Sequence, residues 1–191
     1  MRVRDWFFVV LFLLPGMAMA HTGVGSTHGF EAGLRHPLGG LDHILAMVAV
    51  GLWASQLGGR SIWLVPVAFV FVMAVGGALA MFGIRLPYIE SGILVSVIVL
   101  GLLIAGGVRV PVSVGVILVG IFALFHGAAH GAEMPRGASG YLYASGFMLA
   151  TAGLHLAGVL GGLMLGGLSL SMLTRACGLV VAGYGVFLLA R

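Results

Sequence analysis

The chain has 191 residues, of which 61% are hydrophobic and only 7% are charged, and its mean hydropathy is +1.19. A soluble domain carries roughly 25% charged residues, so this composition excludes a soluble globular protein and predicts an integral membrane protein. The formal net charge of +4 comes from nine arginines and five acids, and because the arginines lie singly between apolar runs, they predict interface anchors and exclude a nucleic-acid-binding surface.

Residues 1–20 have the pattern of a secretory signal peptide. Two arginines near the start precede a short apolar segment, and Ala18-Met19-Ala20 has the A-x-A form of a cleavage site. The apolar segment is short for a membrane span, which needs about 20 residues. Cleavage before His21 is therefore the favoured interpretation, and an uncleaved first helix is the alternative. Both place His21 on the far side of the membrane.

Residues 21–41 are polar and rich in glycine, and their charges, proline and glycines exclude a membrane span. The segment carries three of the seven histidines. If His21 is the mature N-terminus, its amine and imidazole could chelate a transition metal, together with His28. The alternative is an exposed tail without a role in metal binding, so His21 and His28 are secondary candidate ligands.

Six apolar runs follow, each near the length of a membrane span. The junctions between them contain glycine, proline or arginine and are too short to hold another domain. The sequence therefore predicts an all-α membrane protein, with six transmembrane helices in one bundle over residues 21–191, after a cleavable N-terminal signal peptide. The expected spans cover residues 42–57, 61–82, 88–105, 110–131, 139–165 and 170–190.

The small residues of these runs give two further expectations. The chain has 33 glycines, which would let lipid-embedded helices approach one another closely. The single cysteine, Cys177, cannot form an intramolecular disulfide and is expected to be a small core residue.

The first span opens on a motif of histidines and an acid, His36-Pro-Leu-Gly-Gly-Leu-Asp42-His43. Pro37 and the paired glycines argue against a regular helix before Leu41, so His36 is expected on an unwound or re-entrant entrance to the span. Asp42 suits the N-terminus of a helix, where a carboxylate meets the positive end of the dipole. That capping role does not explain the neighbouring His43.

The fourth span ends with the second motif, Phe125-His126-Gly-Ala-Ala-His130-Gly-Ala-Glu133. In a helix, His126, His130 and Glu133 are spaced i, i+4 and i+7 and project from one face. Polar groups at this depth are costly and usually mark a pathway, a relay or a ligand site. His155, the only histidine or charged residue of the fifth span, either hydrogen-bonds across helices or takes part directly in transport, and both interpretations stay open.

The topology predicts that the two motifs meet. A cleaved signal peptide places the start of the first span outside, and the fourth span ends on the same side. Imidazole suits nickel, cobalt, copper and zinc, and carboxylates would offset the charge of a divalent ion. Imidazole ligands must be deprotonated, so metal binding should weaken below about pH 6.5. The side chains that could surround one ion are His36, His43, His126, His130, Asp42 and Glu133.

Together, the two motifs resemble the signature motifs of the HupE/UreJ family, small bacterial membrane proteins encoded with hydrogenase or urease systems. The resemblance covers essentially the whole mature chain, and neither motif departs from the family pattern. It implies secondary uptake of nickel, or of cobalt in some members, across the bacterial inner membrane, with the mature N-terminus in the periplasm. It also implies that the metal pathway contains His36, Asp42, His43, His126, His130 and Glu133.

The favoured hypothesis is therefore a permease and not an enzyme. Its cargo would be Ni²⁺ or Co²⁺, crossing between the first, fourth and fifth spans, with no permanently bound cofactor. The expected partners are the divalent ion and the lipid bilayer, and no nucleic acid. A homo-oligomer is compatible with the sequence but not required by it. One alternative is an intramembrane zinc-dependent hydrolase with Glu133 as general base. Another is a proton relay or accessory subunit without metal. Ligand type alone does not separate nickel from cobalt.

Overall fold

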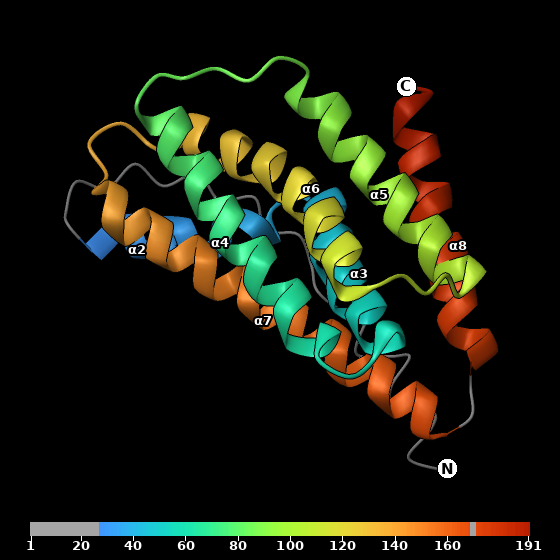
Figure 1. Ribbon diagram of the computed structural model, residues 1–191. Coiled ribbons are helices and arrows are strands. Elements are labelled where there is room, and N and C mark those ends of the chain that lie inside the picture. The colour runs from blue at the N-terminus through green and yellow to red at the C-terminus, as the bar shows by residue number, and fades with distance from the viewer. Residues whose placement is uncertain (1–26, 169–170) are drawn as a thin grey trace, which may run out of the picture.

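The computed structural model describes residues 27–168 and 171–191, and the regular elements in these two ranges are all helices (Figure 1). The predicted signal peptide and His21 lie outside the described residues, as does the side chain of His28. In chain order the elements are α2 (Thr27–Arg35), the 3₁₀ helix η2 (His36–Leu38), α3 (Leu41–Leu57), α4 (Ser61–Met81), α5 (Ile89–Gly106), α6 (Val112–Ala132), α7 (Gly140–Gly167) and α8 (Ser171–Leu189).

Five of these helices, α4 to α8, are long and apolar enough to cross a membrane. The helix α3 has 17 residues and is short for a span by itself. Together with the stretch Gly29–Leu38 it forms a pair bent by 80°, which would count as a sixth, broken span. The described chain is thus a multi-pass helical bundle, and the predicted number of six spans holds only if the bent pair crosses as one. No end of a predicted span moves by as much as one helical turn.

Glycines bring the helices into close contact. The helix α4 packs most closely on α6, α5 on α8, and α7 on both α3 and α2. A Cβ atom on Gly127 in α6 would overlap the carbonyl oxygen of Met73 in α4, and one on Gly51 in α3 would overlap that of His155 in α7. The predicted role of glycine in close helix packing is confirmed at these positions.

The helix α2 lies alongside the beginning of α7 at the edge of the bundle (Figure 1). A Cβ atom on Gly33 in α2 would overlap the carbonyl oxygen of Tyr143, and one on Gly146 in α7 would overlap that of Phe30. From Thr27 onward, the interpretation of this segment as an exposed tail is therefore wrong. A packed helix leads directly into η2 and holds His36 against the bundle.

Most of the outward side chains of the bundle are apolar, which suits contact with lipid. Phe71, Leu102 and Leu179 are exposed on α4, α5 and α8. Cys177 is also exposed, so the prediction that it is a core residue is wrong. Its neighbour Gly178 packs against α5, and the next residue in a helix points about 100° away, which turns Cys177 outward.

Candidate metal site

The first motif folds into a sharp corner. Pro37 lies in the first turn of η2, and Gly40 has an extended backbone with φ −117° and ψ 127°, which interrupts the helix. The chain bends by 80° between the two helical stretches, so His36 and the first turn of α3 face a common space. The predicted irregular entrance at His36 is confirmed. Gly40 is the N-cap of α3, Asp42 lies in its first turn as predicted, and Oδ1 of Asp42 lies 3.2 Å from Nδ1 of His43.

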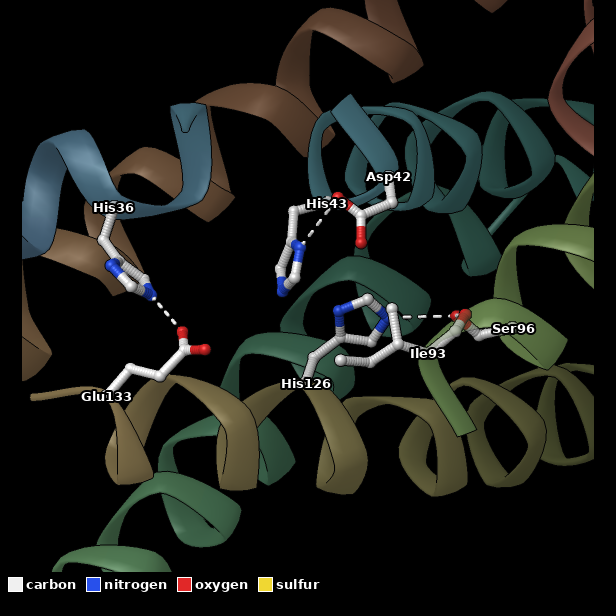
Figure 2. A network of polar contacts seen from close by, with 7 residues as sticks. All are labelled: His36, Asp42, His43, Ile93, Ser96, His126 and Glu133. Carbon is white, nitrogen blue, oxygen red and sulfur yellow. Dashed lines mark hydrogen bonds and ion pairs between the residues drawn. The ribbon is translucent and has the colours of Figure 1, made fainter. Parts of the chain in front are cut away.

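The second motif lies on the last turns of α6. His126 and His130 are buried within the helix, and Glu133 follows its last residue. Figure 2 shows His126 and Glu133 on the side of α6 that faces η2 and the start of α3. The predicted common face of this motif is therefore present.

The two motifs meet at one end of the bundle, here called the motif end, where α3 begins and α6 ends. Nε2 of His36 lies 2.9 Å from Oε2 of Glu133, and the ring centroids of His36 and His130 are 4.9 Å apart. The ring of His43 is centred 4.8 Å from that of His130 and 5.3 Å from that of His126. The predicted proximity of four imidazoles and two carboxylates is therefore observed.

Three of these residues come close to the geometry of a metal site. His36, His130 and Glu133 each offer one ligand atom, and the three atoms lie within 4.8 Å of one another. Both ring nitrogens of His130 are buried without a hydrogen-bond partner. Buried polar atoms normally have partners, so the His130 nitrogen that carries no hydrogen is available for a cation. Among residues 27–168 and 171–191, no other trio of histidine, cysteine or acidic side chains approaches this closely.

A hollow of about 420 Å³ opens at this cluster. Its lining contains three carboxylates and no arginine, which makes it attractive to a cation. The side chains of His36 and Glu133 are 29% and 56% exposed, whereas His130 is buried, so ligands extend from the surface into the bundle. The motif hollow, as we call it, is lined by His36, Gly39, Gly40, Asp42, His43, Glu90, Ala129, His130 and Glu133.

Besides His36, two imidazoles have one nitrogen held by a neighbour. The hydroxyl of Ser96 donates to the carbonyl oxygen of Ile93 at 2.6 Å and also lies 3.0 Å from Nε2 of His126. A hydroxyl has a single hydrogen, so Nε2 of His126 must donate to Ser96, which leaves Nδ1 with a free lone pair. The carboxylate of Asp42 likewise accepts from Nδ1 of His43 and leaves Nε2 free.

The two free nitrogens, Nε2 of His43 and Nδ1 of His126, are buried and have no hydrogen-bond partner. Figure 2 shows both of them facing the space between α3 and α6. A neighbour that holds one ring nitrogen orients an imidazole and directs the other nitrogen to a metal. The arrangement thus supplies two imidazoles that are oriented for metal binding and lie deeper in the bundle than the exposed ligands His36 and Glu133.

Glu90 and Ser96 were not among the residues predicted to form the site. Glu90 lies in the first turn of α5 and lines the motif hollow. An acid at the start of an apolar span, at the same end as both motifs, was the available signal for Glu90. A single serine in an apolar helix gives no comparable signal for Ser96.

His155 lies outside the motif hollow. It is buried in α7, and its ring centroid is 5.0 Å from that of Phe69 in α4. The ring of Phe69 is also centred 5.6 Å from that of His126. Phe69 therefore lies against both His155 and the cluster.

The chain matches the family described as HupE / UreJ protein over residues 9–188. It is also 53% identical to "Protein HupE" of Rhizobium leguminosarum bv. viciae over 146 residues, which cover 76% of each chain. No solved structure matches it. The family match spans nearly the whole sequence and includes both motifs that meet at the motif end. The resemblance inferred from those motifs is confirmed, and the chain belongs to the HupE/UreJ family.

Proposed function

We propose that this protein is a permease that takes up Ni²⁺, or Co²⁺, across the bacterial inner membrane, with the motif end facing the periplasm. The observation that carries the proposal is the convergence of unpartnered imidazole nitrogens and carboxylates from separate helices at an open end of an apolar bundle. Such groups are costly within a membrane and typically mark an ion pathway. The membership of the HupE/UreJ family supports delivery of nickel to enzymes such as hydrogenase or urease.

Capture begins at the exposed ligands of the motif hollow. The carboxylates of Asp42, Glu90 and Glu133 raise the local concentration of cations. A hydrated ion then replaces the hydrogen bond between His36 and Glu133, whose two atoms are 2.9 Å apart, and takes both as ligands. His130 completes a trio that already has its ligand atoms within 4.8 Å of one another.

The ion next passes to the buried imidazoles. His130 adjoins both the exposed ligands and the buried imidazoles, because its ring neighbours those of His36 and His43. The free nitrogens of His43 and His126 provide the next ligands, and their orientation is set by Asp42 and Ser96. Exchange of one imidazole for another lets the ion move inward without losing all of its ligands at once.

The zinc hydrolase alternative gains no support from the described residues. It requires Glu133 as a free general base beside a bound metal. Glu133 is itself a member of the trio with metal-site geometry and hydrogen-bonds to His36. A permease uses the same carboxylate as a ligand, which agrees with its position at the exposed rim.

Uptake of radioactive nickel by cells that lack their own high-affinity nickel transporters tests the proposal. Cells expressing the wild-type chain should accumulate nickel, and His130→Ala and Asp42→Asn should reduce the initial rate to the background of cells without the protein. Membrane abundance of each variant is measured in parallel. Glu31→Gln is the matched control, since Glu31 is an acid that pairs with Arg35 on α2 at 2.8 Å, away from the hollow. Wild-type uptake in both site variants would overturn the proposal.

A further inference from the structure

His155 is a buried imidazole that the motif hollow does not use. Its side chain is 1% exposed, and neither ring nitrogen has a hydrogen-bond partner. It lies about 22 Å along α7 from Gly140, at a rise of about 1.5 Å per residue. A polar side chain without partners at such depth in a membrane protein is unfavourable and points to a function.

One face of α7 connects the motif hollow to His155. Tyr143, Phe147, Thr151 and His155 follow one another at successive turns, and all four are buried. The Tyr143 ring is centred 5.8 Å from that of His36, and the Phe147 ring lies stacked 5.4 Å from that of His130. His155 is about 12 Å farther along this face than Phe147, so it lies deeper than the cluster.

The ring of Phe69 in α4 lies against the imidazoles of both His126 and His155. Its ring centroid is 5.6 Å from that of His126, and it meets the ring of His155 edge-on at 5.0 Å with an interplanar angle of 90°. Phe69 is fully buried. The Phe69 ring therefore lies against both His126, at the inner end of the cluster, and His155.

We propose that His155 is an inner binding site for the transported divalent ion, which reaches it from His126 past the Phe69 ring. The inference rests on the proposed permease function and extends its pathway beyond the family motifs. A neutral imidazole at His155 supplies the nitrogen ligand that a nickel or cobalt ion prefers. The ion thereby exchanges one imidazole for another, and the Phe69 ring must turn to let it pass.

The test separates a ligand from a packing residue. His155→Phe keeps an aromatic ring against Phe69 but removes both nitrogens. His155→Gln keeps a polar group with a weaker ligand atom for nickel. Leu156→Phe is the matched control, because Leu156 is the next residue of α7 and is exposed on the outside of the bundle. Initial rates of radioactive nickel uptake are measured across a range of nickel concentrations and divided by membrane abundance.

We expect His155→Phe to reduce the maximal uptake rate at least ten-fold while the nickel concentration at half-maximal rate changes less than two-fold, because the motif hollow is intact. His155→Gln should reduce the maximal rate at least three-fold, and this variant decides if His155→Phe does not accumulate in the membrane. Leu156→Phe should behave as the wild type. A wild-type maximal rate in the folded His155 variant overturns the inner site. If the wild-type protein itself takes up no more nickel than His130→Ala, the permease function fails instead.

Discussion

His36 and Glu133 are 97 positions apart in the chain, and Nε2 of the first lies 2.9 Å from Oε2 of the second. This contact joins the two motifs at the rim of the motif hollow. An entering cation therefore finds a nitrogen ligand and an oxygen ligand already side by side.

Glu133→Gln should weaken capture of the ion. The substitution removes the negative charge but keeps the size of the side chain, and an amide oxygen is a weaker ligand for a divalent ion than a carboxylate. We expect the nickel concentration at half-maximal uptake to rise about ten-fold, which corresponds to about 1.4 kcal/mol. The measurement is concentration-dependent uptake of radioactive nickel, and an unchanged half-maximal concentration would show that Glu133 is not a ligand.

Ser96→Ala should impair nickel uptake although Ser96 is not proposed to touch the ion. Without the Ser96 hydroxyl, Nε2 of His126 loses its partner, and the ring is free to change its tautomer and orientation. Loss of such a supporting group typically costs about 10–100-fold in metal affinity or activity. Ser96→Thr retains the hydroxyl and should restore most of the uptake.

A matched control for this pair is Ser145→Ala. The Ser145 hydroxyl donates to the carbonyl oxygen of Leu142 at 2.8 Å, as Ser96 does to Ile93, but no histidine neighbour is involved. Ser145→Ala should leave nickel uptake unchanged. Equal losses in both alanine variants would mean that the serine–carbonyl bond, and not the histidine contact, matters.

Binding of nickel to the purified protein should weaken as the pH falls. The imidazole nitrogen binds metal only when it is deprotonated, and an ordinary imidazole has a pKa of about 6.5. Protons compete with the metal ion for the imidazole nitrogens, so the competition grows as the pH decreases. Equilibrium dialysis with radioactive nickel should show at least about ten-fold weaker binding at pH 5.5 than at pH 7.5. Constant affinity over this range would argue against histidine ligands.

Gly127→Ala should destabilise the bundle through the contact of α6 with α4. The added Cβ would overlap the carbonyl oxygen of Met73, so the two backbones must move apart. Overpacking of this kind typically costs about 1–3 kcal/mol. Gly153→Ala is the control, because a Cβ on Gly153 meets no atom within 4 Å. Thermal unfolding in detergent should show a lower midpoint for Gly127→Ala alone, and equal midpoints would contradict the close packing.

Much of the architecture follows from the sequence. Apolar runs mark the helices because each span must satisfy its backbone within the membrane, and the alternating direction of successive spans brings the start of α3 and the end of α6 to one end. The meeting of His43 with His126 could therefore be predicted without coordinates. The local corner at Pro37 and Gly40 was also predictable, since both residues interrupt a helix.

Other features depend on how each helix is rotated about its axis, and a uniformly apolar helix does not reveal that rotation. With α5 rotated as observed, the Ser96 hydroxyl reaches His126, and Gly101 packs so closely on α8 that a Cβ there would overlap the backbone of Ala182. Cys177 was predicted in the core by a rule from soluble proteins. In lipid, an apolar or small side chain is equally stable on the outside, so hydrophobicity does not distinguish the two faces.

The candidate ligands come from two groups of closely packed helices, α2, α3 and α7 in one group and α4 and α6 in the other. His36 belongs to η2, and Asp42 and His43 belong to α3; both elements pack on α7. His126, His130 and Glu133 lie at the end of α6, which packs most closely on α4. In Figure 2, His36, Asp42 and His43 lie on one side of the gap, opposite His126 and Glu133 of α6. A few degrees of tilt between these two groups of helices would change the distances between the imidazoles while every helix stayed intact.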